Sequence, residues 1–378
     1  MTDPLAEHVD VCVVGGGQSA LALAFHLRRA ERRRSGPPLR VLLLDARSHP
    51  GGAWQDAWPS LRLFSPAGYS SLPGRLMPRP PGDQPPDADH VVAYLRDYEQ
   101  RYEVDVRRPV RVTSVERAGD GLRVVTDHGD VLARAVVSAT GTWDRPLWPA
   151  VPGGGEFRGS VLHVHDYRGP EPFAGRRVLV VGGGNSGAQV AADLLGTAAE
   201  VHWVTRRPPR YLPDDVDGRV LFEVATQAVR DRAAGREPRG VGSLGDVVAV
   251  PPVRAARDRG DLVAEPMVQR LTAEGARWPD GHDVGLDAVV WATGFRPALA
   301  HLRGLGLTWT DGHPLTETPD GSPFAVRSAD GVPLWLLGYG DWCGPASATL
   351  IGVGRPAAAV AADVVATLDR RPDQQTDR

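Results

Sequence analysis

The chain has 378 residues, enough for two or three domains that each bury a core. Its 46 acidic and 43 basic residues leave a net charge of −3, and because the basic residues are scattered, nothing indicates a nucleic-acid partner. Every basic residue is an arginine, so a Schiff-base mechanism through lysine is excluded.

Cysteine usage and the apolar segments indicate where such a protein works. Cys12 and Cys343 are the only cysteines, which leaves no C-x-x-C motif, zinc site or disulfide framework. No stretch approaches the roughly 18 apolar residues of a membrane span, and the acidic start Met1–Glu7 is unlike a signal peptide. We therefore predict a cytoplasmic protein with no membrane span and no metal site. The sequence does not indicate its oligomeric state.

The first predicted element is a strand that leads into a glycine turn and a helix. The apolar run Val11–Val14 is followed by Gly15-Gly16-Gly17-Gln18-Ser19-Ala20, which fits the dinucleotide-binding pattern G-x-G-x-x-G/A. Glycines there permit a tight turn, and the helix N-terminus behind them favours a pyrophosphate. We expect Gly15, Gly17, Gln18 and Ser19 to bind that group.

The next strand identifies the kind of nucleotide. Residues Arg40–Leu44 form a predicted strand that ends in Asp45, whose carboxylate would accept hydrogen bonds from ribose hydroxyls and repel a 2′-phosphate. This pattern favours FAD or NAD. The arginine cluster between the helix and this strand is interpreted as a solvated helix end, with a membrane-surface role as the alternative; it comprises Arg28, Arg29, Arg32, Arg33 and Arg34.

A less regular region follows. Residues 49–89 are rich in Pro and Gly and predict loops, His90–Tyr102 predicts a helix, and 109–139 predict short strands separated by turns. The segment Val136–Gly141 closes this region with Ala-Thr-Gly, and residues 146–155 resemble a linker.

A second strand–turn–helix unit begins near Arg176. The run Val178–Val181 precedes Gly182-Gly183-Gly184-Asn185-Ser186-Gly187, a second copy of the glycine pattern. Its second strand, Glu200–Val204, leads to Thr205-Arg206-Arg207 and not to an acid. Guanidinium groups at this place can bind a 2′-phosphate through paired hydrogen bonds, which favours NADPH. Two such motifs predict two cofactors that exchange electrons.

The elements of the rest of the chain are predicted in less detail. We expect helices around Gly218–Arg232, at Val253–Arg257 and at Thr349–Leu368, and strands at Asp287–Trp291 and Leu334–Gly338. Ala292-Thr293-Gly294 repeats the earlier Ala-Thr-Gly, so the two segments are interpreted as crossings between domains. The predicted fold is α/β with two Rossmann-like dinucleotide-binding domains in a disulfide-reductase-like arrangement. The FAD-binding domain would comprise 1–148 and 290–378, and the NADPH-binding domain 153–289.

Three segments carry a resemblance to a known family. Phe157–Tyr167 fits F-x-G-x-x-x-H-x-x-x-[YW], Gly51–Trp54 fits G-G-x-W, and Gly184–Gly187 reads G-N-S-G. The chain thereby resembles flavin-dependent monooxygenases with two dinucleotide-binding domains, the class B type. Three further segments look closest to a bacterial subgroup often encoded in arsenic-resistance operons: Leu61–Pro66, Leu212–Arg219 and Gly338–Trp342.

The resemblance implies an NADPH- and O2-dependent enzyme that forms a C4a-peroxyflavin and oxygenates a soft heteroatom (S, N or trivalent As) of a small molecule. It implies that Gly52 and Trp54 border the flavin ring and that His163 positions NADP+. The other positions that it implies are Val110 for adenine, Thr140 and Gly141 in the FAD site, Asp341 for the ribityl chain, Gly182, Gly184, Asn185 and Ser186 for the NADPH pyrophosphate, and Thr293 and Gly294 for the nicotinamide half.

Two departures from the family pattern concern the chemistry. Many members carry an Asn near the flavin where this chain has Phe64-Ser65-Pro66, so Ser65 is a candidate donor for oxygen activation. Tyr167 replaces Trp-Pro at the end of the signature, which resembles heteroatom oxygenases more than Baeyer–Villiger enzymes. Capture of arsenic by three thiols is impossible with two cysteines.

Alternatives remain open from the residues alone. The chain could be a flavoprotein reductase that passes electrons to a quinone or protein, a Baeyer–Villiger oxygenase, or a redox sensor that binds only NADPH. Trp54 could be core packing, Asp341 a helix cap, and His163 a surface residue of a linker. We expect the substrate pocket to be built from the 50–80 loop, residues 210–250 and the Trp342–Ser347 turn.

Overall fold

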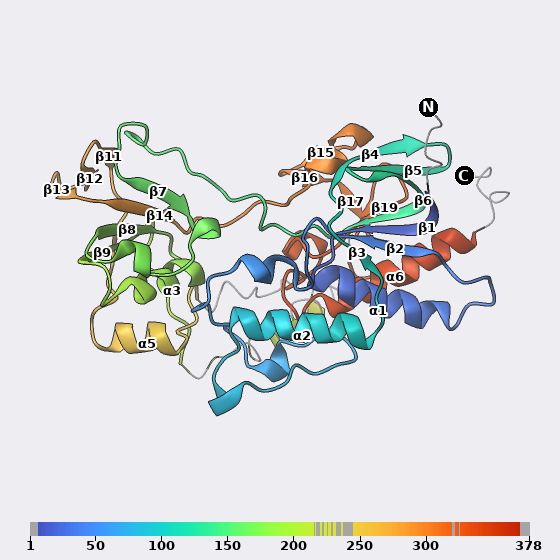
Figure 1. Ribbon diagram of the computed structural model, residues 1–378, viewed down its shortest axis with the longest axis horizontal. Helices are drawn as coiled ribbons and strands as arrows, with labels where there is room; N and C mark the ends of the chain where they lie inside the picture. Colours follow the sequence, from blue (N-terminus) through green and yellow to red (C-terminus); the bar gives the residue numbers. More distant parts are fainter. Residues whose placement is uncertain are drawn as a thin grey trace.

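The computed structural model describes residues 7–214, 216, 220, 223–224, 226–227, 230–231, 236, 245–319, 322–324 and 326–370. Two separate sheets organise these residues, and Figure 1 shows them side by side along the long axis of the molecule. We call the part built on the nine-stranded sheet the first lobe and the part built on the five-stranded sheet the second lobe. The helix expected around Gly218–Arg232 lies mostly outside the described residues.

The first lobe combines a parallel centre with an antiparallel edge. Strands β1, β2, β3, β6 and β19 pair in parallel, and β4, β5, β17 and β18 pair antiparallel. In spatial order the main path is β17 (Thr316–Glu317), β18 (Arg327–Ser328), β19 (Leu334–Leu336), β6 (Gly129–Ser138), β1 (Glu7–Val14), β2 (Val41–Leu44) and β3 (Val106–Arg107), with β4 (Val112–Ala118) and β5 (Gly121–Thr126) joined to β6.

Apolar residues on both faces of β1 explain its central position. Val11 and Val13 are fully buried against helices α1 (Gln18–Glu31) and α6 (Gly354–Asp369), while Cys12 is fully buried on the other face. A strand buried on both faces must be covered by two layers, as in other parallel sheets. Helix α2 (Ala88–Arg101) completes the helical side, and η7 (Ala300–Leu305), with the β4–β5 hairpin, covers the opposite face.

The second lobe repeats this design on a smaller scale. Its sheet has the order β10 (Ala264–Pro266), β9 (Glu200–Thr205), β8 (Arg177–Val181), β14 (Ala288–Trp291) and β7 (Ser160–His163), all parallel. Helices α3 (Asn185–Leu194) and α5 (Pro251–Asp258) cover one face. A small antiparallel sheet covers the other, formed by β11 (Arg270–Thr272), β12 (Gly275–Arg277) and β13 (Asp283–Gly285). The strands β15 (Trp309–Thr310) and β16 (His313–Pro314) form a separate hairpin.

The remaining elements are single turns of 3-10 helix. They are η1 (Gly52–Asp56), η2 (Ala67–Tyr69), η3 (Pro81–Asp83), η4 (Val164–Asp166), η5 (Glu171–Phe173) and η8 (Asp341–Cys343). The expected helix boundaries shift where side chains cap the backbone. Asp87 accepts a hydrogen bond from the His90 backbone N–H and starts α2 before His90. Thr349 accepts one from the Gly352 backbone, so the last helix begins at Gly354 and not at Thr349.

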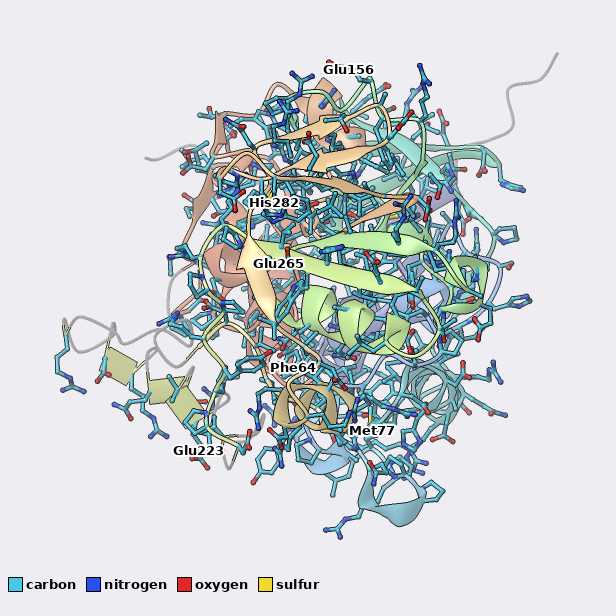
Figure 2. All side chains as sticks on the ribbon, turned by 90° about the vertical axis from the view of Figure 1, so that its left-hand side faces the viewer. Phe64, Met77, Glu156, Glu223, Glu265 and His282 are labelled. Atoms are coloured by element: carbon cyan, nitrogen blue, oxygen red, sulfur yellow. The ribbon has the colours of Figure 1, made fainter. Side chains whose placement is uncertain are left out.

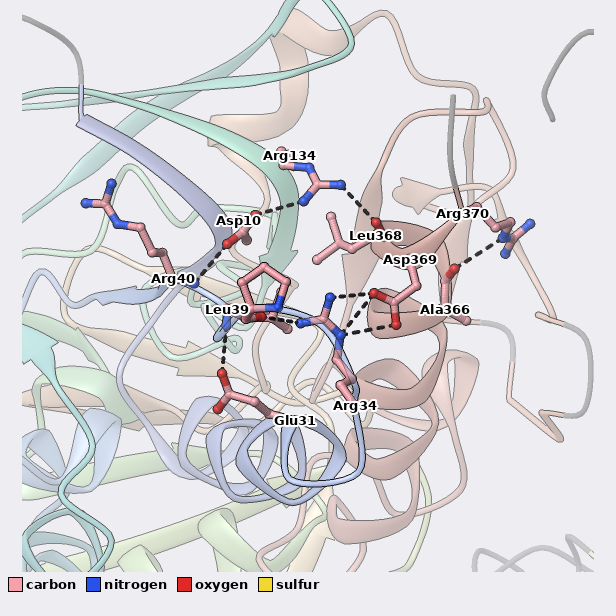
Figure 3. A network of polar contacts seen from close by, with 11 residues as sticks. Asp10, Glu31, Arg34, Leu39, Arg40, Arg134, Ala366, Leu368, Asp369 and Arg370 are labelled. Atoms are coloured by element: carbon pink, nitrogen blue, oxygen red, sulfur yellow. Dashed lines mark hydrogen bonds and ion pairs between the residues drawn. The ribbon is translucent and has the colours of Figure 1, made fainter. Parts of the chain in front are cut away.

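The arginine cluster at the end of α1 contributes Arg34 to a surface network of ion pairs and hydrogen bonds. Arg34 donates to both carboxylate oxygens of Asp369 at the end of α6. Arg134 bridges Asp10 of β1 and the Leu368 carbonyl, each at 2.9 Å. Figure 3 shows these contacts, which tie the C-terminal helix to the N-terminal strand and helix. No described helix has the length and apolar character needed to cross a membrane.

The two Ala-Thr-Gly segments run beside each other where the chain passes between the lobes. The Leu147 N–H donates to the Gly294 carbonyl, and the Ala298 N–H donates to the Gly141 carbonyl, each at 2.9 Å. These bonds make the two connections a short antiparallel pair with Pro146 opposite Phe295. The predicted fold class, two Rossmann-like units in one α/β chain, is confirmed.

Candidate functional site

A cavity of about 350 Å³ lies between the two glycine turns. Residues of both lobes line it, because the first residues of α1 and of α3 both border it. The predicted site residues that line the cavity are Gly15, Gly17, Gln18, Ser19, Asp45, Gly52, Trp54, Thr140, Gly141, Asn185 and Ser186. The predicted site residues that do not line it are Ser65, Val110, His163, Gly182, Gly184, Thr205, Arg206, Arg207, Thr293, Gly294 and Asp341.

The first glycine turn is packed so closely that side chains are excluded. Gly15 has a φ of +113°, and a Cβ there would lie 2.5 Å from the Ala139 carbonyl oxygen. A Cβ on Gly52 would lie 2.8 Å from the Gly17 Cα. Backbone atoms alone therefore form this part of the wall, which is what a pyrophosphate needs in order to approach peptide N–H groups.

Both helices that face the cavity begin without a side-chain cap. The N-cap residues are Gly17 for α1 and Gly184 for α3, and neither has a side chain that could accept from the first turn. Within the described chain, no group accepts a hydrogen bond from the backbone N–H groups of Gln18 or Ser186. Unpaired N–H groups and the helix dipole make each end an anion-binding site.

Asp45 lies in the cavity wall and pairs with Arg108, which the sequence did not identify as its partner. Only 4% of Asp45 is exposed, and its carboxylate accepts from Arg108 Nε at 3.1 Å and from the Arg47 backbone N–H at 3.3 Å. Arg108 is also paired with Glu99 at 2.6 Å. Each oxygen of Asp45 retains a second acceptor position for a ribose hydroxyl. Arg108 follows β3, far from Asp45 in sequence, so only the β2–β3 pairing brings the two together.

Trp54 borders the cavity and is held by a side chain of the glycine turn. Its indole Nε1 donates to Gln18 Oε1 at 3.0 Å. The ring is half-buried against the core of the first lobe, so cavity lining and core packing are both true of it. Gln18 also donates to the Ala348 carbonyl at 2.8 Å, which connects this wall with the segment before α6.

Thr140 ends a buried polar network. Tyr339 OH lies 2.8 Å from Thr140 Oγ1 and accepts from the Thr140 N–H at 3.1 Å. The same hydroxyl contacts Ser138 Oγ, which lies 3.0 Å from His301 Nε2. Burial raises the pKa of Tyr339 to about 12 and lowers the pKa of His301 to about 4, so both groups are neutral near pH 7.

The second glycine turn resembles the first in geometry. Gly182 has a φ of +149°, and a Cβ there would lie 2.2 Å from the Ala292 carbonyl oxygen. Its own carbonyl accepts from Trp203 Nε1 at 2.7 Å. Asn185 Oδ1 accepts from the Val248 N–H at 2.8 Å, which ties α3 to the segment before α5. The sequence pattern therefore predicts the turn correctly, although Gly182 and Gly184 do not line the cavity.

The basic segment after β9 is arranged as a charged edge. Thr205 is buried at the end of β9, and its side chain lies near Gly183 of the glycine turn. Arg206 and Arg207 are exposed, and no ion pair to a described residue holds either of them. Free guanidinium groups beside the second glycine turn are suited to a 2′-phosphate.

His163 is fully buried, and its interpretation as a surface linker residue is wrong. Its Nδ1 accepts from the His165 N–H at 3.1 Å, while Nε2 makes no regular hydrogen bond among the described residues. Burial lowers its pKa. The ring packs edge-on against Phe295, which stacks on Trp143 of the cavity wall. His163 is therefore connected to the cavity wall indirectly, through Phe295 and Trp143.

Asp341 and Val110, which the resemblance places at the ribityl chain and at adenine, do not line the cavity. Asp341 is exposed and accepts from the Ala346 N–H at 3.1 Å, as a capping residue does, and Gly338 and Ala348 line the cavity instead. Val110 lies before β4 and not within a strand, and its N–H donates to the Asp45 carbonyl at 2.8 Å. That N–H is therefore engaged and not free for adenine.

Ser65, Thr293 and Gly294 lie near the cavity but face other surroundings. Ser65 lines a neighbouring cavity, described below. Thr293 Oγ1 donates to the Leu147 carbonyl at 2.6 Å, and Gly294 has a φ of +83°, so both shape the crossing between the lobes. These contacts do not test the prediction that both residues bind the nicotinamide half.

Several residues of the wall were missed because they belong to the irregular 49–89 segment or to connections. Trp58, which has 1% of its surface exposed, reaches into the core of the second lobe and packs against Tyr167. Gln189 of α3 forms two hydrogen bonds with the backbone of Arg62. The apolar residues Trp58, Leu61 and Phe64 within a Pro-rich loop were the available signal. No group of three acidic, His or Cys side chains in the described chain could hold a metal ion.

Two family profiles match parts of the chain. One is described as an NAD(P)-binding Rossmann-like domain and matches residues 13–58; the other is described as pyridine nucleotide-disulphide oxidoreductase and matches residues 72–220. A flavin-containing monooxygenase of Stenotrophomonas maltophilia has a solved structure with 47% identity, a TM-score of 0.83, and coverage of 96% of this chain and 99% of that one.

Relatives known from sequence are more distant. The indole-3-pyruvate monooxygenase YUCCA1 of Oryza sativa subsp. japonica is 31% identical over 318 residues, which are 75% of this chain and 76% of the relative. Among solved structures, the bacillithiol disulfide reductase of Staphylococcus aureus is similar in fold alone, with 15% identity, a TM-score of 0.68, and coverage of 96% of this chain and 99% of that one.

The chain belongs to the flavin-containing monooxygenase family. It is an FAD-containing oxidoreductase that also uses NAD(P)H, and small-molecule oxygenation with O2 is the reaction of this family. The cavity residues fit these cofactors, because two uncapped helix N-termini, two glycine turns closed to side chains and a buried acid surround one space.

Proposed function

We propose that this chain is an NADPH- and O2-dependent monooxygenase that oxygenates a soft heteroatom of a small molecule, such as sulfur, nitrogen or trivalent arsenic. For a sulfide, one atom of O2 forms the S=O bond and the other leaves as water. NADPH gives up a hydride, which carries two electrons, and becomes NADP+; the hydrogen of that hydride and one proton from solvent are the two hydrogens of the water. Bound FAD supplies the activation of O2, through the C4a-peroxyflavin that the sequence resemblance implies.

The two lobes divide the cofactors in this proposal. Residues 1–148 and 290–378 would bind FAD, with the Gly15–Ser19 turn at its pyrophosphate and Asp45 at its adenosine ribose. Residues 153–289 would bind NADPH, with Asn185 and Ser186 at the pyrophosphate and Thr205, Arg206 and Arg207 at the 2′-phosphate. Gly52, Trp54, Thr140 and Gly141 would border the flavin, and Thr293 and Gly294 the nicotinamide half. We also propose a cytoplasmic location and membership of the subgroup found in arsenic-resistance operons.

One observation carries the proposal: the uncapped N-termini of α1 and α3 open on the same cavity from two lobes. An NADPH sensor would need only the second turn. Electron transfer between the cofactors requires that their reactive rings meet, and a shared cavity supports this. The aromatic side chains of Trp54, Trp58 and Trp143 in the wall suit an oxygenase, because apolar walls limit the contact of a reactive oxygen species with water.

The reaction of the reduced enzyme with O2 distinguishes a monooxygenase from the reductase alternative. The purified protein should be yellow. We expect the enzyme, reduced anaerobically with NADPH and mixed with O2 in a stopped-flow instrument, to show a long-lived absorbance distinct from oxidised flavin. Direct reoxidation without this phase, together with electron delivery to a quinone, would favour the reductase. Product analysis with a sulfide and with a cyclic ketone separates heteroatom oxygenation from carbonyl insertion.

A further inference from the structure

A second cavity of about 390 Å³ lies directly beside the cofactor cavity. Leu63 and Phe64 line both spaces, so the two cavities adjoin at this pair of residues, which is part of the wall of each. Figure 2 labels Phe64 beside helix α5, whose first turn forms the far side of the second cavity. Its volume is in the range of small-molecule sites.

The walls of this second cavity contain several prolines, which restrict the backbone. Four prolines from three chain segments line it: Pro66, Pro80, Pro85 and Pro251. Each pyrrolidine ring fixes its own φ, so little conformational entropy is lost on binding. Asn185 further holds the Val248 backbone, and Arg62, next to the shared wall, is paired with Asp87 at 2.7 Å.

Among the described residues of the lining, positive charges exceed negative ones. Its charged side chains with a described position are Arg79, Arg254 and Asp214, which is one net positive charge. Asp214 is already engaged by Arg257, at 2.8 and 2.9 Å, and lies 3.6 Å from Arg254. Arg79 is exposed, and no described carboxylate pairs with it. The remaining lining is largely apolar, with Phe64, Val248, Ala249 and Val250 among its members.

We propose that the second cavity binds the organic substrate, and that it selects an apolar thioether that carries a carboxylate, with Arg79 as the partner of the carboxylate. This inference rests on the proposed function and adds the substrate class and a specificity residue. The apolar part of the substrate would occupy the space between Phe64 and Val250, with its sulfur at the place where this cavity adjoins the cofactor cavity. The carboxylate would remain at the arginine rim, where it retains partial hydration.

A matched pair of substrates tests the inference. Thioanisole and 4-(methylthio)benzoate share the ring and the thioether and differ in the carboxylate alone. We expect the holoenzyme to favour the carboxylate in kcat/KM, and Arg79→Gln to reduce this ratio about three- to tenfold, the range for a partly exposed ion pair. The loss should lie in KM, and Arg79→Lys should restore part of it. Arg96→Gln, an exposed arginine of α2, is the control and should leave the ratio unchanged.

Failure of this inference differs from failure of the proposed function. If both sulfides are oxygenated with a ratio that Arg79→Gln does not alter, the cavity assignment is overturned while the oxygenase stands. If neither sulfide is oxygenated, binding of 4-(methylthio)benzoate is measured by calorimetry. Weaker binding to Arg79→Gln than to Arg96→Gln would then support the site, and equal or absent binding would overturn it.

Discussion

The side-chain amide of Gln189 pairs with the backbone of Arg62 on both sides. Its Oε1 accepts from the Arg62 N–H at 2.9 Å, and its Nε2 donates to the Arg62 carbonyl at 3.0 Å. Gln189 belongs to α3 of the second lobe, and Arg62 to the loop that extends from the first lobe. This pair therefore fastens the two lobes at the edge of the cofactor cavity, which both residues line.

Gln189→Ala should lower the free energy of unfolding by about 1–3 kcal/mol, because it leaves a partly buried N–H and carbonyl of Arg62 without partners. Urea denaturation measures this difference. Gln100→Ala on the exposed side of α2 is the control, and an equal effect of both substitutions would contradict the structural role of the pair.

Adding one methyl group to either glycine turn should show which cofactor that turn binds. Gly15→Ala brings a Cβ to 2.5 Å from the Ala139 carbonyl, and Gly182→Ala brings one to 2.2 Å from the Ala292 carbonyl, both at positive φ. The backbone strain alone is roughly 1–3 kcal/mol. We expect the first variant to lose FAD, and the second to stay yellow but to be reduced slowly by NADPH.

Flavin absorbance and anaerobic reduction rates measure these two outcomes. Gly155→Ala is the control, because a Cβ there meets no atom within 4 Å and the residue does not have positive φ. Loss of flavin from both variants, or from neither, would contradict the assignment of one cofactor to each turn.

The charged edge after β9 should determine the choice of nicotinamide cofactor. Each charge-assisted hydrogen bond to a 2′-phosphate contributes about 1.5–3 kcal/mol, which corresponds to a preference for NADPH over NADH of about ten- to a hundredfold. Replacing Arg206 and Arg207 together by Ala should remove most of this preference. The ratio of kcat/KM for the two nucleotides is the measurement, with Arg259→Ala as a control in the same lobe. Equal values in the unaltered enzyme would defeat the assignment.

The buried His301 should make stability fall as the pH is lowered. Burial lowers its pKa from 6.5 to about 4 in the folded chain, so between these values the unfolded chain binds the proton more readily. Its contribution is complete above pH 6.5 and is lost as the pH falls toward 4, by about 2 kcal/mol at pH 5. His301→Gln should therefore show a smaller loss of unfolding free energy between pH 7.5 and pH 5, measured by urea denaturation. An identical loss in both proteins would exclude this cause.

His163 should act on the reaction as a positioning residue. Its ring contacts Phe295, and Phe295 stacks on Trp143 at 4.8 Å between ring centres, so a change at His163 reaches the cavity wall. We expect His163→Gln to retain FAD and to divert part of the consumed NADPH into hydrogen peroxide. The ratio of peroxide formed to NADPH consumed measures this effect, and an unchanged ratio would remove His163 from the site.

Local patterns were sufficient for the strands and glycine turns of both nucleotide units. Strand, turn and helix are contiguous at Val11–Ala20 and at Val178–Gly187, and glycine is required there by positive φ and by the approach of a neighbouring backbone. The acid at Asp45 and the arginines after Thr205 were likewise readable, because each follows its strand directly.

Asp341 and Val110 show which contacts local reading does not predict. Both lie in turns whose direction depends on what the chain packs against, and the structure assigns the carboxylate of Asp341 to the Ala346 backbone and the N–H of Val110 to the Asp45 carbonyl. The burial of His163 beneath Phe295 could not be read for the same reason, since the two residues meet only when β7 and β14 pair.

The sequence by itself determined the two nucleotide units and the resemblance to a family, because these depend on neighbours within a few residues. Only the tertiary structure decided that both helix N-termini open on one cavity, that Arg108 pairs with Asp45 and that Phe64 lines two adjoining cavities. Those facts depend on which distant segments meet when the two sheets bury their apolar faces, and no local pattern encodes that meeting.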